Sequence, residues 1–339
     1  MYPAIRPLLF ALDPERAHRL ALDALRLAGR RTLRLQAGAP VECMGLRLPN
    51  RVGLAAGFDK NAVAVDGLGS LGFGFIEVGT ITPRAQPGQP LPRLFRRPAD
   101  GALINRLGFP NEGAERVASR LSTRRYRGIV GLNIGKNAST PVERAIDDYV
   151  SCLRTVRGVA DYIAVNVSSP NTAGLRDLQA RHYLEPLLTA LLQERERGLG
   201  SNEHRPPLLV KISPDLSRDQ LQDIATLLKE LPLDGIIATN TTLNSTGINS
   251  GTGNRAGGLS GRPLHPISVR AVAQLRAQLG PHFPIIGVGG IDSAQAAVDM
   301  RAAGADLVQL YTGLIYRGPG LVAQCVRALD HWSESSAPP

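Results

Sequence analysis

Eight short apolar runs alternate with helical patterns between residues 41 and 332, and this alternation constrains the fold more than any other feature of the sequence. Each run is rich in Val, Ile, Leu or Ala and has the length of a buried strand. The runs cover residues 52–57, 74–80, 128–135, 162–169, 208–213, 235–241, 284–290 and 307–313. Eight strand–helix units in this order predict an α/β fold, a parallel (β/α)8 TIM barrel.

Helical patterns separate the strands, with examples at residues 141–156, 183–197, 217–231, 266–279, 293–303 and 320–332. A doubly wound open sheet is the alternative architecture for such an alternation. No GxGxxG motif follows the first predicted strand, so a Rossmann-type dinucleotide site has no support. The two longest non-helical insertions, residues 82–108 and 242–262, are expected to form lids or walls of a site.

Residues 1–40 form a separate N-terminal segment. Asp13 and Pro14 are typical of a helix N-cap followed by proline, so the pattern predicts a short helix over residues 3–10 and a longer amphipathic helix that extends to Arg31. Periodicity alone favours packing of this helix on the chain's own domain. The alternative is a helical pair lying on an anionic membrane surface, because its polar face is rich in arginine. Residues 41–332 would then form the barrel, and residues 333–339 a disordered tail.

Composition narrows the classes of partner. The 339 residues carry a formal net charge of +10, which suits anionic small molecules or an anionic membrane surface. Aromatic residues make up only 4% and the basic residues are spread along the chain, so we expect no nucleic-acid binding. Cys43, Cys152 and Cys325 lack metal-binding spacing, which predicts inert thiols in a reducing compartment. The sequence shows no apolar run of transmembrane length and no signal-peptide pattern.

The fourth predicted strand ends abruptly in a polar cluster. Pro170 removes a backbone donor and restricts the residue before it, so the strand must stop there. One interpretation is a binding site at the carboxyl edge of the sheet. The other is a turn whose side chains cap their own backbone. The cluster consists of Asn166, Ser168, Ser169, Asn171 and Thr172.

Asn, Lys, Ser or Thr also occurs at nearly every other predicted strand end, and all these ends share one face of a barrel. Lys60 follows the first strand, where small residues permit close approach of a flat ligand; a solvated lysine after a turn is the alternative. Lys211 lies inside the fifth predicted strand, where a buried ammonium is costly unless it meets an anion. We therefore expect Lys211 to contact a ligand.

Glycines after the last two strands indicate which chemical groups that ligand contains. Gly289-Gly290 and Thr312-Gly313 lie where barrels commonly bind phosphate on backbone N–H groups. A phosphate joined to a planar, polar ring fits flavin mononucleotide (FMN), with Lys211 stabilising negative charge on the reduced ring. The strand ends carry no acidic metal cluster and no catalytic His, so we expect no metal and no triad chemistry.

Ten motifs in order along the chain resemble one family, the class 2 (quinone-dependent) dihydroorotate dehydrogenases of pyrimidine biosynthesis. An N-terminal helical extension, here with DPERAH at residues 13–18, separates class 2 from the shorter class 1 enzymes of that family. The motifs are AAGFDKN (55–61), GTITP (79–83), NRLGFPN (105–111), NIGKN (133–137), NVSSPNT (166–172), VKISPD (210–215), TNTT (239–242), GGLSGRPL (257–264), IIGVGGI (285–291) and QLYTG (309–313).

The resemblance implies oxidation of (S)-dihydroorotate to orotate. Ser169 would be the general base that removes the C5 proton while hydride passes from C6 to FMN, with help from a water chain and Thr172. Class 1 enzymes have Cys at this position, so Ser169 argues against class 1 and its fumarate or NAD acceptors. The implied substrate-binding residues are Lys60, Asn105, Arg106, Leu107, Gly108, Phe109, Asn166, Asn171, Asn240 and Thr241.

The resemblance also implies a cofactor site and a quinone site. Ubiquinone would enter between the N-terminal helices near His18, Arg96 and Tyr311, although a histidine on a helix surface is an equal interpretation of His18. The implied FMN-binding residues are Ala56, Gly57, Phe58, Asp59, Lys60, Thr80, Asn133, Asn166, Lys211, Thr239, Gly261, Gly290, Tyr311 and Thr312.

A quinone tail must be drawn from lipid, so the resemblance favours the membrane-surface interpretation of residues 1–40. We expect a monomer bound peripherally to the cytoplasmic side of the inner membrane. Two rival functions remain at this stage: another FMN-dependent barrel oxidoreductase acting on a different cyclic substrate, and a catalytically silent barrel that only binds a ligand. The asparagine set and Ser169 discriminate against a different cyclic substrate, because a changed substrate should alter these residues. The presence of Lys60, Ser169 and Lys211 argues against a silent barrel.

Overall fold

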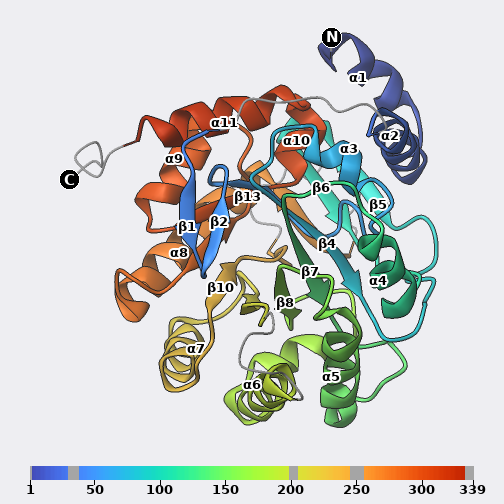
Figure 1. Cartoon of the computed structure of the whole chain (residues 1–339). Coiled ribbons are helices and arrows are strands. Elements are labelled where there is room, and N and C mark those ends of the chain that lie inside the picture. Colours follow the sequence, from blue (N-terminus) through green and yellow to red (C-terminus); the bar gives the residue numbers. More distant parts are fainter. Residues whose placement is uncertain (1, 30–37, 198–204, 245–255, 333–339) are drawn as a thin grey trace.

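Eight parallel strands close into a barrel (Figure 1) in the computed structural model, which describes residues 2–29, 38–197, 205–244 and 256–332. The closed sheet confirms the predicted TIM barrel and excludes the open doubly wound sheet. Around the barrel the strands follow the order β10-β12-β13-β3-β4-β7-β8-β9. They are β3 (Val52–Leu54), β4 (Phe75–Ile81), β7 (Ile129–Ile134), β8 (Tyr162–Asn166), β9 (Leu208–Ile212), β10 (Gly235–Ala238), β12 (Ile285–Val288) and β13 (Leu307–Leu310).

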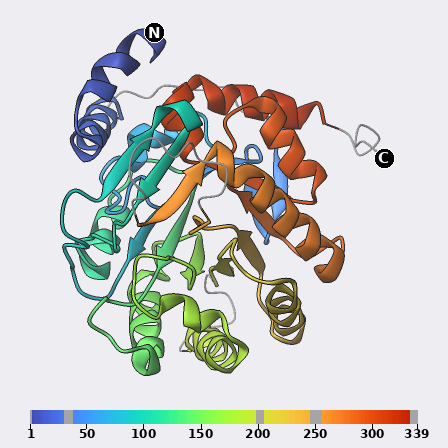
Figure 2. The same ribbon diagram turned by 180° about the vertical axis from the view of Figure 1, so that it is seen from behind.

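Helices surround the barrel, as the view from behind in Figure 2 shows. The six predicted helices occur with ends shifted by a few residues. The largest shift is at α5, which begins at Ala145 because residues 142–144 form a 3-10 turn. The helices are α3 (Val65–Gly69), α4 (Ala114–Ser122), α5 (Ala145–Val156), α6 (Arg181–Glu196), α7 (Arg218–Glu230), α8 (His265–Leu279), α9 (Ala294–Ala302), α10 (Thr312–Arg317) and α11 (Gly320–Asp330).

The barrel interior is filled by side chains rather than forming a pore. Phe75, Tyr162, Leu209 and Ile286 belong to one buried cluster that comes from strands around the barrel. The hairpin β1 (Val41–Cys43) and β2 (Leu46–Leu48), which periodicity did not predict, packs on this cluster. Apolar faces of the helices pack against the outer surface of the strands in a second, larger cluster. The core therefore has the two layers expected of a β/α barrel.

The two long insertions form part of a separate three-stranded antiparallel sheet. Its strand order is β11-β6-β5, and β6 pairs with both neighbours. Residues 245–255 of the second insertion lie outside the described part of the chain. The strands are β5 (Leu94–Arg97), β6 (Ala102–Asn105) and β11 (Gly258–Gly261). The prediction that these insertions wall a site is tested by the cavity described below.

The N-terminal helices α1 (Tyr2–Ala11) and α2 (Pro14–Ala28) lie at one edge of the barrel, near α3, α10 and β5 (Figure 1). Asp13 caps α2 as predicted, but α2 ends at Ala28, and residues 30–37 lie outside the described chain. The Arg96 guanidinium donates hydrogen bonds to the carbonyl oxygens of Leu9 (3.2 Å), Phe10 (3.2 Å) and Leu12 (2.7 Å). A cation at these carbonyl groups favours a helix C-terminus, so Arg96 holds the end of α1.

Most of the apolar surface of these two helices stays exposed. No residue of α1 is buried, and Ala17 is the buried residue of α2. Ile5, Leu8, Leu12, Leu20 and Leu27 are exposed, with Leu8 at 72% and Leu27 at 62%. Leu22 and Leu25 of α2 do pack against the barrel core, as periodicity alone favours. Exposed leucines beside them are compatible with a contact to another molecule or a membrane, which stays a prediction.

Gly67 lets α2 approach the barrel. A Cβ at this position would overlap the carbonyl oxygen of Leu25 in α2. We predict that Gly67→Ala displaces α2, because the overlapping atom is backbone and cannot rotate away. Amide hydrogen exchange in residues 14–28 should accelerate about tenfold or more, while the core strands keep their protection. Gly158→Ala is the control, since nothing lies within 4 Å of its added Cβ. Unchanged exchange in Gly67→Ala would contradict this docking.

Candidate active site

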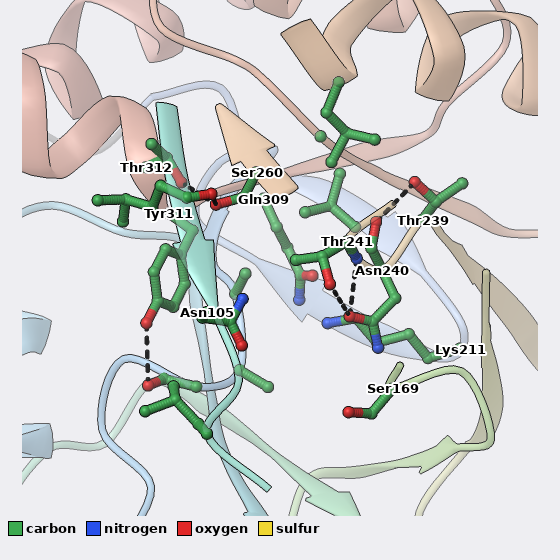
Figure 3. Close-up of a pocket in the computed structure, with 18 of the residues that line it drawn as sticks. Asn105, Ser169, Lys211, Thr239, Asn240, Thr241, Ser260, Gln309, Tyr311 and Thr312 are labelled. Atoms are coloured by element: carbon green, nitrogen blue, oxygen red, sulfur yellow. Dashed lines mark hydrogen bonds between the residues drawn. The ribbon is translucent and has the colours of Figure 1, made fainter. Parts of the chain in front are cut away.

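A cavity opens at the carboxyl ends of the barrel strands, walled on one side by β5, β6 and β11 (Figure 3). It contains about 1010 Å³ of empty space, counting the solvent at its open mouth. Its described lining includes two lysines and no carboxylate. The predicted site residues that line it are Ala56, Gly57, Lys60, Thr80, Asn105, Leu107, Gly108, Phe109, Asn166, Ser169, Asn171, Lys211, Thr239, Asn240, Thr241, Gly261, Gly290, Tyr311 and Thr312.

Ser169 reaches the cavity from the turn after β8. Strand β8 ends at Asn166, three residues before the predicted end, because the Asn166 side-chain oxygen accepts a hydrogen bond from the Ser168 N–H (3.2 Å) and turns the chain. The Ser169 hydroxyl accepts a hydrogen bond from the Asn171 N–H at 3.3 Å. Thr172 is buried nearby in the chain, and its hydroxyl has no hydrogen-bond partner among the described residues. The cluster therefore caps the turn and also lines a cavity, and its role as a binding site stays a prediction.

Asn166 is the centre of an amide and hydroxyl network. Its Nδ2 donates to Thr80 Oγ1 (2.9 Å) and to Asn133 Oδ1 (3.0 Å). Asn240 Nδ2 donates to Asn166 Oδ1 (3.2 Å) and to Ser168 Oγ (3.0 Å). Because these groups come from four different strand ends, the closed barrel fixes the amides in place before any ligand binds.

A second amide pair joins the wall to the barrel. Asn171 Nδ2 donates to Asn105 Oδ1 at 2.9 Å, and Asn105 Nδ2 donates to the Gly258 carbonyl oxygen at 3.2 Å. Asn105 ends β6, whereas Asn171 follows β8. The loop after β8 is thus held against the three-stranded sheet on the side where Ser169 faces the cavity.

Lys60 brings one cationic group to the cavity. Its Nζ donates to the Gly57 carbonyl oxygen at 2.8 Å. Burial lowers the pKa of Lys60 to about 8, and the nearby Glu15 carboxylate of α2 opposes that shift. Glu15 also forms an ion pair with Arg93, Nε to Oε1 at 2.9 Å. The N-terminal helix therefore helps to keep this ammonium charged at neutral pH.

Lys211 brings the other cation, from inside β9. Its Nζ lies 3.4 Å from Oε1 of Glu77, a fully buried carboxylate of β4. The prediction that a buried Lys211 must meet an anion is met in part by this protein group, which sequence reasoning missed. Glu77 was hidden because it is a lone acid inside an otherwise apolar strand.

Glycines shape the far end of the cavity. Gly261, Gly289 and Gly290 have positive φ of 96°, 143° and 67°. A Cβ on Gly290 would lie 2.7 Å from the Gly261 carbonyl oxygen, so the turns after β11 and β12 meet closely. The Thr312 hydroxyl donates to Ser260 Oγ at 2.9 Å beside them. Close-packed backbone without side chains is what a phosphate-binding end requires.

An aromatic path runs from α2 to the cavity. The rings of His18 and Phe58 are edge-to-face at 5.1 Å, and those of Phe58 and Tyr311 at 5.9 Å. Burial and the Lys60 charge lower the pKa of His18 to about 4, so the imidazole is neutral at pH 7. The Tyr311 hydroxyl donates to the Gly57 carbonyl oxygen at 3.2 Å, and burial raises its pKa to about 12.

Six predicted site residues do not line the cavity. Asp59 accepts backbone hydrogen bonds from residues 63 and 64, and burial raises its pKa. The Arg106 guanidinium instead donates to the Pro92 carbonyl oxygen, at 3.2 and 2.9 Å, and lies over the Phe95 ring. Asn133 supports Asn166 from behind, and Phe58 contacts His18. The six are His18, Phe58, Asp59, Arg96, Arg106 and Asn133.

The cavity also includes residues that the sequence did not single out. Gln309 is the most informative, because it is buried and its Oε1 has no partner among the described residues. Leucines of β5 and β6 supply the apolar wall, a role that hydrophobic periodicity cannot separate from ordinary packing. The residues missed are Ala55, Leu94, Leu103, Ser260, Leu264, Val288, Ile291 and Gln309.

Three further features of the described residues bear on the chemistry of the site. These residues contain no group of three or more His, Cys, Asp or Glu that could hold a metal ion. None of their helices is long and apolar enough to cross a membrane. Cys43, Cys152 and Cys325 are free thiols whose pKa burial raises, and none lines the cavity.

Comparison with known proteins decides the family. Residues 39–332 match the family profile described as dihydroorotate dehydrogenase. A Bordetella parapertussis protein named dihydroorotate dehydrogenase (quinone) is 53% identical over 342 residues, covering 98% of each chain. A Burkholderia thailandensis protein of the same name is 51% identical over 335 residues, covering 97% of each chain. The chain belongs to the dihydroorotate dehydrogenase family.

Solved structures agree with this assignment. The crystal structure of the Eimeria tenella dihydroorotate dehydrogenase in complex with ferulenol matches with a TM-score of 0.87 and 39% identity, covering 94% of this chain and 90% of that one. The resemblance to class 2 is confirmed by relatives named for their quinone. The chain is accordingly an oxidoreductase of a flavin-dependent family.

The cavity fits a flavin. A flat ring needs a floor without bulky side chains, which the residues Ala55, Ala56 and Gly57 provide. A ring with N–H and carbonyl groups needs both acceptors and donors. Gln309, whose buried Oε1 has no partner among the described residues, and Lys211 both line the cavity. The glycine end suits a phosphate, so these features support a flavin site.

The pKa of Lys60 gives a direct test of the site's electrostatics. We predict that Glu15→Gln lowers this pKa below about 8, because an anion that stabilises the ammonium is lost while Arg93 still opposes it. Isotope-labelled lysine NMR can follow the titration, since the chain has only four lysines. Asp13→Asn is the control, because the substitution removes an α2 charge that has no part in the Lys60 shift. Equal Lys60 titrations in Glu15→Gln and the parent would rule out this coupling.

Proposed function

We propose that this chain oxidises (S)-dihydroorotate to orotate with FMN as hydride acceptor and ubiquinone as final electron acceptor. The observation that carries the proposal is a hydroxyl, Ser169, facing a cavity that holds two lysines, five amides and no carboxylate among its described lining residues. Such a cavity selects an anionic ring with several hydrogen-bonding groups. Family membership then favours dihydroorotate over another cyclic substrate or a silent barrel.

The amides and Lys60 would hold the substrate. Dihydroorotate carries a carboxylate and a ring with two N–H groups and two carbonyl groups, so it needs a cation, donors and acceptors together. Asn105, Asn166, Asn171 and Asn240 are held by one another and by backbone carbonyls, and their remaining donors and acceptors can face the ligand. The Lys60 ammonium supplies the positive charge for the carboxylate. The side chains of Leu107 and Phe109 provide apolar contact beside the ring.

Ser169 would act as the general base. Its oxygen would take the proton from C5 of the substrate as the C5–C6 double bond forms. A serine hydroxyl is a weak base, so a proton acceptor must take its own proton onward. Thr172 is buried, and its hydroxyl has no hydrogen-bond partner among the described residues, so it can relay the proton along a chain of water molecules to the solvent, which is the final acceptor.

FMN would supply the acceptor for the hydride that leaves C6 of the substrate, and would pass the electrons on one or two at a time. Ala56, Gly57, Thr80 and Lys211 would contact the ring. The set at the glycine end, Thr239, Gly261, Gly290 and Thr312, would hold the phosphate end. Lys211 would stabilise the negative charge of the reduced ring. Asn133, Phe58 and Asp59 lie behind this lining and would support it rather than touch the cofactor.

Ubiquinone would be reached through the N-terminal helices. His18, Phe58 and Tyr311 connect α2 with the cavity, and Arg96 fixes the end of α1. The exposed leucines of α1 and α2 would rest on the membrane, which places a quinone headgroup beside this path. Residues 1–40 would thus be the membrane and quinone segment, and residues 41–332 the FMN barrel, of a monomer on the cytoplasmic side of the inner membrane.

Anaerobic stopped-flow absorbance tests the two half-reactions. We predict that dihydroorotate bleaches the flavin band of the purified protein and that a ubiquinone analogue restores it, whereas fumarate and NAD do not. Ser169→Ala should keep the flavin but slow bleaching by about 10²–10⁴-fold, the usual contribution of a general base. Recovery with quinone should be unchanged in this variant, because the second half-reaction does not use Ser169.

Several outcomes would count against parts of this proposal. Equal bleaching rates in Ser169→Ala and the parent would exclude Ser169 as the base. A yellow protein that dihydroorotate does not bleach would leave the cofactor but exclude the substrate. A colourless protein that takes up no flavin would exclude the whole assignment.

Membrane contact through the helices is separately testable. We predict that the double variant Leu8→Asp and Leu20→Asp binds anionic lipid vesicles at least about tenfold more weakly, because each leucine loses roughly 1 kcal/mol or more of apolar burial. Sedimentation with vesicles measures the binding. Leu243→Asp is the matched control, since Leu243 is 55% exposed on the barrel rather than on the helices. Equal losses in both variants, or none in either, would refute a helix-specific contact.

A further inference from the structure

Glu77 lies beneath the cavity floor, where four strands direct hydrogen-bond donors at one carboxylate. Oε1 accepts from Asn133 Nδ2 at 2.8 Å and lies 3.4 Å from Lys211 Nζ. Oε2 accepts from Gln309 Nε2 at 2.7 Å and from the Tyr162 hydroxyl at 3.0 Å. Glu77 is fully buried and does not itself line the cavity. Since all four neighbours donate, the site accommodates an ionised carboxylate.

The carboxylate determines which way the Gln309 amide faces. The Gln309 Nε2 is directed to Glu77, and its position within 3.5 Å of the Tyr162 oxygen agrees with that direction. A flipped amide would place its oxygen against the carboxylate, which is repulsive. The Gln309 Oε1 is therefore left as a buried acceptor without a partner among the described residues, in a side chain that lines the cavity.

The same carboxylate offsets the charge of Lys211. Among the described residues, Glu77 is the acid within ion-pair distance of Lys211 Nζ. Lys211 belongs to the cavity lining, so its ammonium lies between a buried anion below and the ligand space above. The positive electrostatic potential that Lys211 produces in the ligand space is therefore reduced by the negative charge of Glu77.

We propose that Glu77 is a positioning residue that tunes the electron affinity of the bound flavin, by orienting the Gln309 carbonyl and by offsetting the Lys211 charge. The inference rests on the proposed function, because it requires the flavin ring in this cavity. Reduction adds negative charge to the ring, which Lys211 favours and Glu77 opposes. The orientation of Gln309 has a similar effect. Its carbonyl oxygen cannot donate a hydrogen bond to the negative charge of the reduced ring, whereas an N–H group could. Glu77 thereby keeps the flavin a moderate oxidant that can still pass its electrons to a quinone.

The test compares two substitutions that separate charge from shape. Glu77→Gln keeps the shape and removes the charge, and its amide allows Gln309 to flip and present N–H to the cavity. Glu77→Asp keeps the charge but shortens the side chain. The measurements are the flavin reduction potential, by equilibration with a redox dye, and the affinity of the bound flavin for sulfite, which leaves negative charge on the ring. Neither measurement depends on turnover.

We expect Glu77→Gln to raise the potential and to tighten sulfite binding about tenfold or more, because Lys211 is no longer offset. Glu77→Asp should stay near the parent in both measurements. A purely structural role predicts the reverse pattern, since the shortened side chain disturbs the buried contacts more. Parent-like values in Glu77→Gln, or equal shifts in both variants, would overturn the proposal.

A second comparison covers the case in which Glu77→Gln does not retain flavin. The double variant Glu77→Gln and Lys211→Met removes both charges and leaves no unpaired ion in the barrel. The flavin reduction potential of the double variant should lie above that of Lys211→Met alone, because the negative charge of Glu77 is absent from the double variant. Equal potentials in these two proteins would also overturn the proposal. A protein that holds flavin and is bleached by dihydroorotate, yet shows no Glu77 effect, would leave the proposed function standing.

Discussion

Closure of eight parallel strands into one barrel is the constraint on which the rest of the structure depends. It brings every strand's carboxyl end to one face, so polar residues at the strand ends and in the turns after them meet although they are far apart in sequence. Asn166 at the end of β8 can then bond groups from β4, β7 and the turn after β10. Such a network is costly to bury unless each amide is paired. The barrel supplies that pairing.

The N-terminal helices add a second layer to this plan. They bury little of their own surface, so their position depends on a few polar anchors: Arg96 at the end of α1 and the Glu15–Arg93 ion pair at the start of α2. Gly67 allows backbone contact between α2 and α3. Leu22 and Leu25 of α2 pack against the barrel core, whereas no residue of α1 is buried, so α1 is the part that can yield locally while the barrel stays folded. That property suits a segment through which an apolar quinone would enter.

Sequence could predict the barrel because strands and helices follow from short-range patterns, whereas most of the predicted cavity residues came from the resemblance to the family. Apolar runs mark the strands, and residues just after each run must lie on one face. The same patterns could not predict the sheet of β5, β6 and β11, because its pairing joins two insertions far apart in the chain. The family motif placed Arg106 in the substrate site, whereas its guanidinium donates a hydrogen bond to the Pro92 carbonyl oxygen. Glu77 was missed because its partners come from four other strands, which no local pattern reveals.

Charge balance connects these two layers. The chain has only four lysines, and the two that line the cavity have different counter-charges. Lys211 is offset from below by Glu77, which the barrel encloses completely. Lys60 is supported by Glu15, which belongs to the N-terminal helix and is only partly buried. The interaction between Lys211 and Glu77 is enclosed by the barrel and responds little to its surroundings. The interaction between Lys60 and the partly buried Glu15 changes when the helix that carries Glu15 moves. Movement of α2 would therefore change the charge next to Lys60 and leave the charge next to Lys211 unaffected.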